Sequence, residues 1–481
     1  MKLTFQIRFH TQPGQSLWLT GNHPMLGDAR EDRAIPMQYR DTEFWSVTFD
    51  LPGADAPDAD IVYHYVLRNA DGNATHDWGS DHRFNPASFK AETVSIIDAW
   101  NSASFFENAF YTEPFQRVLL KSNHTEVRVP APVRVTHKFK VKAPLLEKGQ
   151  TLCLLGSNRA LGNWNTTSPV LLNRVAEESF LSVELDLTNA GFPIDYKYGV
   201  YDVERKEFVR YEEGDNRTLA AAGTPNQLIV INDGFAVLPA TTWKGAGVAI
   251  PVFSLRSEAS FGVGEFTDLK LLTDWCRQVG LRLIQILPVN DTIATHTWRD
   301  SYPYSAISAF ALHPQYLNLN CVAAGRNKAL LKSLEPERQQ LNALAEVDYE
   351  GVLKSKLAFV KRLYLLQKAK TFQSQAYRQF FSENQHWLVP YAVFCHLRDR
   401  FGSADFTQWP KHSQYRANEI ATLAEADAEA ADDIALNYFI QYHLHLQLKE
   451  ASEYAHAKGI ILKGDIAIGV SRHGVDAWQQ P

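Results

Sequence analysis

The chain has 481 residues, of which 45% are hydrophobic and 21% are charged, and its formal net charge is −6 at pH 7. This composition is ordinary for a globular protein, and the length predicts more than one domain, since single cores stop growing at about 250 to 300 residues. The negative charge gives no electrostatic attraction to nucleic acid or anionic lipid, and no apolar run approaches the roughly 18 residues that span a bilayer. We therefore expect neither nucleic acid nor a membrane as a partner.

The four cysteines are scattered along the chain, at Cys153, Cys276, Cys321 and Cys395. Their spacing suggests neither a disulfide framework nor a zinc site. We expect a cytoplasmic protein, which is the usual compartment for unpaired cysteines. We also expect no bound metal and no cofactor.

The first half of the chain contains an internal repeat at a nearly constant offset of 134 to 136 residues. The paired stretches are "WLTGNHPMLGDA" (18–29) with "LLGSNRALGNW" (154–164), "FWSVTFDL" (44–51) with "FLSVELDL" (180–187), and "SDHR" (80–83) with "GDNR" (214–217). Constant spacing across three patches indicates two copies of one domain.

Each copy opens with strict alternation of apolar and polar residues, which is typical of a strand with one buried face. At the start of the chain, "MKLTFQIRFHTQPG" follows this pattern and so predicts a strand rather than a signal peptide. The same alternation runs over 133–141 in the second copy. Short strands separated by Gly, Pro and Asn turns follow in both copies. We therefore predict two all-β sandwiches, at 1–115 and 130–236, which fold independently.

The pattern changes after residue 240. "GAGVAIPVFSL" and "LRLIQILPV" read as apolar strands, and "GEFTDLKLLTDWCRQVG" between them has helical spacing. A strand, a helix and a strand with short loops predict parallel pairing. From about 336 to 458 the pattern is mostly helical, and "GIILKGD" (459–465) is a third strand.

Motifs of the second copy resemble the starch-binding carbohydrate modules of family 20. They are "GSNRALGNW" (156–164), "DYKY" (195–198) and "YEEGDNR" (211–217). The resemblance implies an α-glucan site made of Trp164, Lys197, Tyr211, Glu212 and Asn216. Aromatic planes would grip the apolar faces of glucose rings, and the charged groups would reach hydroxyls. The alternative for Trp164 is a place in the sandwich core, but a polar turn is a poor place to bury an indole.

The first copy departs from this pattern. Ala29 stands where the family has Trp, and His64 stands where it has Lys, although Trp78 is retained. We expect a weaker or altered binding face formed by His64 and Trp78. A purely structural role for the first copy is the alternative.

Four ordered motifs in the second half resemble the family 77 4-α-glucanotransferases, or amylomaltases. They are "SFGVGEFTDL" (260–269), "LIQILPV" (283–289), "DSYPYSAISAFALHPQYLNL" (300–319) and "KGDIAIGVSRHGVDAW" (463–478). With the tandem modules, the chain is similar to the plant disproportionating-enzyme-2 type. The resemblance implies that 240–481 is the N-terminal portion of a (β/α)₈ TIM barrel with a helical insertion at about 336–458. It also implies transfer of glucosyl units from maltose or maltooligosaccharide to glycogen or starch.

The same resemblance implies four sugar-contacting residues in the barrel. Tyr304 would pack beneath the sugar at the cleavage site, and Asp300 would accept hydrogen bonds from sugar hydroxyls nearby. Asp465 would orient the active site, while His473 replaces an acid that touches the bound sugar in ordinary amylomaltases. The alternative for Tyr304 is a loop tyrosine packed on the helical insertion.

Retaining glycoside chemistry needs two carboxyl groups about 5 to 5.5 Å apart, one as nucleophile and one as acid/base. The resemblance places both on later barrel strands, and only three of the eight strands are recognisable before Pro481. We therefore expect the catalytic carboxylates beyond Pro481 and an inactive 481-residue chain. The alternatives to a glucanotransferase are a retaining α-glucan hydrolase and a non-catalytic starch- or glycogen-binding protein.

Overall fold

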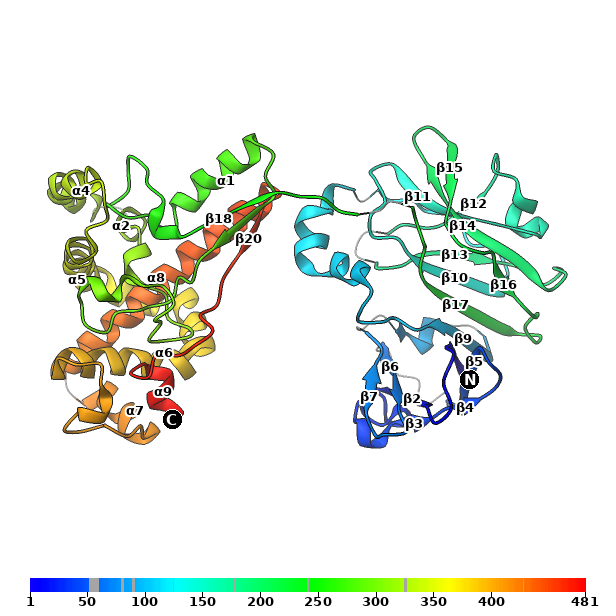
Figure 1. Ribbon diagram of the computed structural model, residues 1–481, viewed down its shortest axis with the longest axis horizontal. Helices are drawn as coiled ribbons and strands as arrows, with labels where there is room; N and C mark the ends of the chain where they lie inside the picture. The colour runs from blue at the N-terminus through cyan, green and yellow to red at the C-terminus, as the bar shows by residue number, and fades with distance from the viewer. Residues whose placement is uncertain are drawn as a thin grey trace. The chain divides into compact units, whose positions relative to one another are not determined.

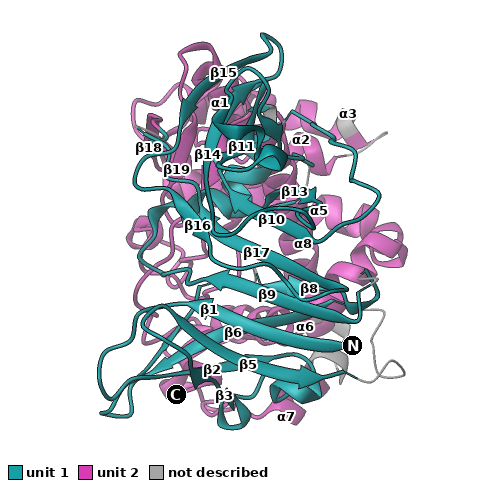
Figure 2. Ribbon diagram, turned by 90° about the vertical axis from the view of Figure 1, so that its right-hand side faces the viewer, with its two compact units in different colours: residues 1–243 teal, residues 244–481 magenta. Residues whose placement is uncertain are grey.

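The computed structural model of the protein describes residues 1–51, 60–78, 82–88, 91–123, 125–175, 178–239, 242–323, 327–426 and 428–481. Ser80 and Asp81 of the repeated "SDHR" stretch lie outside the described residues. The chain forms two compact units, 1–243 and 244–481, which Figure 2 colours separately. Across the described ranges, no helix combines the length and the apolar character needed to cross a bilayer.

The described residues of the first unit form one seven-stranded sheet and two five-stranded sheets. The seven-stranded sheet has the order β13 (Leu181–Leu185), β10 (His137–Lys142), β17 (Gln227–Phe235), β9 (Thr93–Ala99), β1 (Lys2–Arg8), β5 (Phe44–Asp50) and β4 (Gln38–Tyr39). In the first copy, a five-stranded sheet contains β3 (Ile35–Pro36), β2 (Ser16–Gly21), β6 (Ile61–Arg68), β7 (Ala74–His76) and β8 (Arg83–Phe84). Its counterpart in the second copy contains β12 (Val170–Leu171), β11 (Gln150–Gly156), β14 (Ile194–Asp202), β15 (Glu207–Tyr211) and β16 (Arg217–Leu219).

Apolar–polar alternation produces the first strand of each copy. In β1 every second side chain, Leu3, Phe5 and Ile7, is fully buried. In the second copy the alternation predicts a strand from Val133, but β10 begins at His137 and Val133 is exposed. The ladder with β13 begins at the pair of His137 and Leu185, and the backbone of Thr136 still bonds to Leu185 and Ile229, so the pairing starts three residues after Val133.

The last strands of the two copies, β9 and β17, lie side by side in parallel, so the copies share one sheet (Figure 2). Thr93 is paired with Gln227 at one end of this ladder, and Asp98 with Asn232 at the other. The seven-stranded sheet is therefore continuous across both copies. The local sequence patterns do not predict this pairing.

The two cores lie on opposite faces of the shared sheet. On β17, Leu228 and Val230 pack in the core of the first copy, whereas Ile229 and Ile231 pack in the core of the second. Successive side chains of a strand point to opposite faces. Each five-stranded sheet therefore covers a different face of the seven-stranded sheet.

The second unit is built on three parallel strands in the order β18 (Gly247–Ile250), β19 (Leu283–Ile286) and β20 (Ile461–Lys463). Its helices are α1 (Asp268–Gln278), α2 (Leu319–Val322), α3 (Lys328–Leu331), α4 (Glu335–Asn342), α5 (Tyr349–Gln373), α6 (Gln375–Phe401), α7 (Ala417–Ala426), α8 (Ala428–Ala457) and α9 (Val475–Gln479). Figure 1 shows α1 and α8 beside the strands. Three parallel strands make an open sheet, and closure into a (β/α)₈ barrel stays a prediction.

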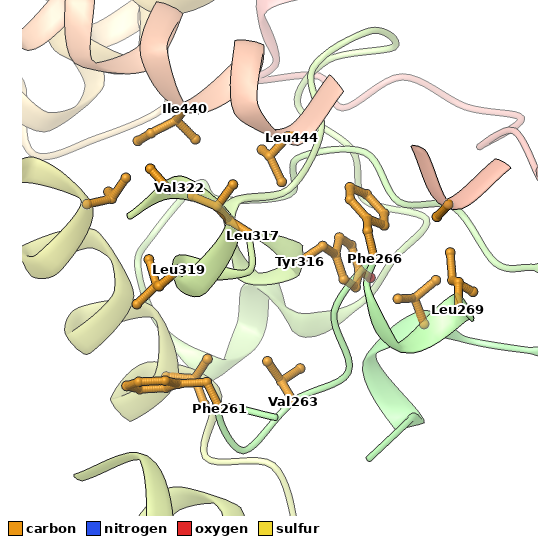
Figure 3. Close-up of a cluster of buried hydrophobic side chains, with 14 of the residues drawn as sticks. Phe261, Val263, Phe266, Leu269, Tyr316, Leu317, Leu319, Val322, Ile440 and Leu444 are labelled. Atoms are coloured by element: carbon orange, nitrogen blue, oxygen red, sulfur yellow. The ribbon is translucent and has the colours of Figure 1, made fainter. Parts of the chain in front are cut away.

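The core of the second unit lies between α1, α8 and the segment that follows β19. Phe266 and Tyr316 stack with their ring centroids 5.3 Å apart. Leu269 of α1 and Ile440 and Leu444 of α8 are buried around this pair (Figure 3). The same core includes Ile284 and Ile286 of β19, so it fixes the strand whose carboxyl end leads to the candidate site.

Candidate functional site

Two residues expected at the sugar site meet at the carboxyl edge of the parallel sheet. Tyr304 lies in the loop after β19, and Asp465 follows the end of β20 by two residues. The Tyr304 hydroxyl donates a hydrogen bond of 2.9 Å to Oδ2 of Asp465, although the residues are 161 positions apart. This hydrogen bond raises the pKa of the Tyr304 phenol. The carboxyl ends of neighbouring parallel strands are where α/β enzymes carry their ligand-binding groups.

The other two residues expected at this site have partners of their own. Asp300 is buried. Its carboxylate accepts two hydrogen bonds from Thr295, one from the backbone N–H at 2.8 Å and one from the side-chain hydroxyl at 3.0 Å. Nδ1 of His473 lies 3.2 Å from Oδ1 of Asp405, and its ring contacts that of Phe406. Asp300 therefore orders the loop that carries Tyr304, and His473 is held against the segment between α6 and α7.

On the second copy, Trp164 and Tyr211 form a partly exposed aromatic pair. Their ring centroids are 6.4 Å apart, and the ring planes are inclined by 64°. Trp164 ends a turn in which Gly162, Asn163 and Trp164 have φ values of 73°, 47° and 61°. Left-handed φ is unusual for residues other than glycine, and such strain is typical of functional sites. The turn leaves the indole partly exposed rather than in the sandwich core.

The remaining candidate sugar ligands of the second copy differ in exposure. Lys197 donates a hydrogen bond of 2.5 Å to the backbone oxygen of Gly214, and Asn216 is exposed. Glu212 is buried, and its carboxylate accepts hydrogen bonds from Arg217 at 2.9 Å and from a backbone N–H of β14 at 3.0 Å. Lys197 and Asn216 can therefore reach a ligand, while Glu212 anchors the strand that carries Tyr211.

A buried hydrogen-bond network, which the sequence analysis did not predict, lies on the other side of the sheet from Lys197. The hydroxyls of Tyr196 and Tyr198 donate to Oδ2 of Asp233 at 2.9 and 2.8 Å, and Arg217 lies 3.5 Å from Oδ1 of the same carboxylate. Glu212 and Asp233 raise the pKa of Arg217 against the opposing effect of burial, so it stays charged. The alternation in "DYKY" is the signal that could have found the network, because it puts both tyrosines on the face opposite Lys197.

The equivalent face of the first copy keeps the turn but not the side chains. Gly27, Asp28 and Ala29 repeat the three left-handed residues, with φ values of 84°, 57° and 59°, so a methyl group replaces the indole. His64 takes the place of the lysine, and its ring centroid lies 5.7 Å from that of His76. This face therefore offers two imidazoles where the second copy offers an indole, a phenol and an amine.

The strand pairing identifies which residues of the first copy correspond to Glu212 and Tyr211 of the second. Asp77 bonds through its backbone N–H to β6 as Glu212 bonds to β14. His76 is therefore the counterpart of Tyr211, and the half-exposed Trp78 falls one residue beyond Asp77 rather than in the position of the tyrosine. Trp78 cannot complete an aromatic pair in the way that Tyr211 does.

His82 occupies the position of Arg217 in the first copy. It pairs with β6 at Tyr63, as Arg217 pairs with β14 at Tyr196. Its Nε2 lies 2.5 Å from Oδ2 of Asp77, and its Nδ1 lies 3.3 Å from Oδ1 of Asp98. Burial lowers the pKa of His82, but the two carboxylates outweigh burial and raise it to about 10. The first copy thus has a titratable cation, His82, where the second has the permanently charged Arg217.

Two family models match the chain. Residues 1–95 and 132–229 match the starch binding domain, and residues 250–481 match the 4-alpha-glucanotransferase model of glycoside hydrolase family 77. The chain combines two starch-binding domains with a family 77 region. We call the two copies of the repeat the starch-binding modules, after the domain that they match, and the parallel strands β19 and β20 lie in the region that matches family 77.

Relatives of this family cover the chain to different extents. The 4-alpha-glucanotransferase DPE2 of Oryza sativa subsp. japonica is 35% identical over 497 residues, which cover 100% of this chain and 51% of that protein. The 4-alpha-glucanotransferase of Chlamydia muridarum is 32% identical over 48% of this chain and 42% of its own length. The chain thus spans about half the length of the curated relatives it matches. The solved amylomaltase of Streptococcus agalactiae in complex with acarbose is 21% identical, covering 50% of this chain and 46% of its own, with a TM-score of 0.41.

Proposed function

We propose that the protein acts as a 4-α-glucanotransferase that moves α-1,4-linked glucosyl units from maltose or maltooligosaccharide to a glycogen- or starch-like acceptor. The observation that carries this proposal is the 35% identity with the rice 4-alpha-glucanotransferase DPE2 across the whole of this chain. That similarity includes the starch-binding modules and the family 77 region in the same order.

In this proposal the Tyr304–Asp465 pair builds the sugar-binding floor of the family 77 region. The phenol ring packs under a glucose ring, and its hydroxyl holds the Asp465 carboxylate in one orientation. The remaining lone pairs of Asp465 accept hydrogen bonds from sugar hydroxyls, and such bonds are strong because the acceptor is charged. Orientation of the glucosyl group before bond cleavage lowers the entropic part of the barrier.

The reaction would be a retaining double displacement. A carboxylate nucleophile forms a covalent glycosyl intermediate, an acid/base carboxyl group protonates the leaving oxygen, and a sugar hydroxyl then replaces the nucleophile. We assign neither carboxylate within residues 1–481. Transfer rather than hydrolysis requires the acceptor sugar to outcompete water for the same intermediate.

The second starch-binding module would hold the polymeric acceptor. Trp164 and Tyr211 supply inclined aromatic planes for a curved glucan, and Lys197 and Asn216 supply polar groups at their edge. Binding of one polymer by both the module and the family 77 region would raise the effective concentration of acceptor ends. We propose a lesser contribution from the first module, because Ala29 and His64 replace the indole and the amine.

The test incubates maltose and glycogen with the 481-residue chain and with a form that spans the full length of its relatives. One glucose released per maltose, with matching growth of glycogen, supports transfer. Two glucoses per maltose without glycogen growth would show a hydrolase instead. Maltoheptaose binding without any product from either form would leave a non-catalytic glucan-binding protein.

A further inference from the structure

A groove runs along the seam of the two starch-binding modules, on the face of β10 and β17 that points away from the core of the second module. It consists of three adjoining pockets of about 340, 370 and 800 Å³. Neighbouring pockets share lining residues, which are Phe180 and Asn232 at one junction and Ser88 and Lys138 at the other. Volumes in the range of about 300 to 1,000 Å³ are typical of ligand sites.

The shared sheet creates this groove. Lys138 and Lys140 of β10 lie on its floor, and Arg83 and Asn85 of the first module line it from the other side. The floor residues alternate with Phe139 and Val141, which are buried in the core of the second module, so they point to the opposite face. A single sandwich could not form such a site, because the floor and the wall come from different modules.

At the centre of the groove, a buried acceptor lies beside a partly exposed lysine. Lys140 and Asn232 are register partners on adjacent parallel strands, and both line the 370 Å³ pocket. Asn232 is 6% exposed, and its Oδ1 has no hydrogen-bond partner among the described residues. The Lys140 ammonium lies 4.5 Å from the centre of the Phe180 ring, and within the described ranges no acceptor lies within hydrogen-bond distance of it.

The orientation of the Asn232 amide is fixed by its other contact. Its Nδ2 donates to the carboxylate of Asp98, which can only accept, so Oδ1 is the amide atom left without a partner among the described residues. A ligand that satisfies both Lys140 and Asn232 must accept a hydrogen bond and donate one. A hydroxyl group does both, whereas an ionised carboxylate cannot donate to Oδ1.

We propose that this seam groove binds an α-glucan chain, with Lys140 donating to sugar hydroxyls and Asn232 Oδ1 accepting from them. The groove carries charges of both signs, from Arg83, Lys138 and Glu178, which suits a neutral polyhydroxylated ligand. This inference rests on the proposed binding of α-glucan by the modules. It adds a second glucan site, distinct from the outer face of Trp164 and Tyr211.

The test is calorimetric titration of the full chain with maltoheptaose. The wild type should bind at two sites, and Trp164→Ala should retain one of them. Lys140→Met, which keeps the length of the side chain but removes its donor, should weaken the groove site about tenfold to a hundredfold, as expected for loss of a charged hydrogen bond. Trp164→Ala combined with Lys140→Met should therefore show almost no binding.

The matched control is Gln6→Met, at the position of β1 that corresponds to Lys140 in β10, which should leave both sites intact. Hydrogen–deuterium exchange of the wild type gives a readout that needs no variant, since maltoheptaose should protect the amides of Arg83 and Asn85. Complete loss of binding in Trp164→Ala, with no effect of Lys140→Met, would overturn the groove while leaving glucan binding by the outer face. Binding of inorganic phosphate to Trp164→Ala, without a maltoheptaose signal in the same variant, would assign the groove to anions and also overturn the proposal. Absence of maltoheptaose binding in the wild type would contradict the proposed function itself.

Discussion

Asn232 of the second starch-binding module donates a hydrogen bond to Asp98 of the first, across the two parallel strands that join the modules. Asp98 also accepts hydrogen bonds from Tyr63 and Tyr65, at 2.8 and 2.7 Å, in the buried interior of the first module. The interior polar network of one module is thus completed by a side chain of the other. Modules joined in this way should unfold together.

Val230 tests this cooperativity, because it belongs to the second module in sequence but packs in the core of the first. Val230→Ala should destabilise the first module by about 1 to 3 kcal/mol through lost burial and a residual cavity. Hydrogen exchange should show lowered protection in β1 and β6. The control is Val209→Ala at a half-exposed position of β15, which should change little. Unchanged protection in β1 would mean that the modules are independent, as the sequence analysis expected.

The histidine at position 82 should make the stability of the first unit depend on alkaline pH. Its pKa is about 10 in the folded protein, above the ordinary value near 6.5, so its stabilising charge is fully present below about pH 6.5 and is lost as the pH rises through about 10. The free energy of unfolding should fall by roughly 2 to 4 kcal/mol between pH 7 and pH 10. His82→Arg, which copies Arg217, should remove this decline.

Denaturant titrations at several pH values measure the effect, with His76→Arg as the control at a more exposed histidine of the same module. A decline that is as steep in His82→Arg as in the wild type would show that another group titrates.

The outer face of the first module should become a glucan site when the missing side chains are restored. Ala29 lies at the same position of the same left-handed turn as Trp164, so an indole placed there has a matching backbone. We expect Ala29→Trp with His64→Lys and His76→Tyr to add one maltoheptaose site in a calorimetric titration. Ala29→Trp alone, which lacks the second aromatic plane and the amine, should add little. No added site in the triple variant would show that other features of the face matter more.

The sequence could predict those parts of the molecule that local patterns encode. The period-2 alternation of Leu3, Phe5 and Ile7 marks β1, and the apolar run before Asp465 marks β20, so the place of Asp465 at a strand end follows directly. The proximity of Tyr304 to Asp465 then follows from parallel pairing of neighbouring strands.

The pairing of β9 with β17 could not be predicted in this way, because it depends on contacts between segments about 134 residues apart. The role of His82 escaped the analysis for a related reason. When the two repeats are aligned at a constant offset, Arg83 falls opposite Arg217. The strand pairing instead makes His82, one residue earlier, the counterpart of Arg217. The same offset places Asp77 opposite Tyr211, and the shift of one residue moves the match to His76, two residues before Trp78.

A buried ion pair in the family 77 region should be costly to break. Lys356 donates to the carboxylate of Glu265 and to the backbone oxygen of Gln315 at 2.6 Å, and both charged side chains are almost fully buried. Burial raises the pKa of Glu265 and lowers that of Lys356, so each charge depends on its partner. Lys356→Met should destabilise the second unit by about 3 to 5 kcal/mol, because it leaves an unpaired buried carboxylate.

Chemical denaturation of the full chain would measure this loss. Glu265→Gln combined with Lys356→Met should recover part of it, since no charge is then left unpaired. Lys361→Met, which removes an exposed ion pair to Asp433, is the control and should cost at most about 1 kcal/mol. A loss of that small size in Lys356→Met would show that water reaches the Glu265 carboxylate.

Removal of the Tyr304 hydroxyl should separate its two proposed roles. Tyr304→Phe keeps the ring that packs under the sugar but removes the hydrogen bond that orients Asp465. In a form that spans the full length of its relatives, we expect disproportionation of maltotriose to fall by about tenfold to a hundredfold, the usual effect of losing a hydrogen bond to a charged group. Tyr302→Phe is a matched control, because this neighbouring ring lies 5.6 Å away and is largely exposed. Because orientation of Asp465 matters most when the glucosyl group is transferred, the loss should lie in kcat more than in KM. Equal activity of Tyr304→Phe and wild type would remove the hydroxyl from the mechanism and leave only the ring.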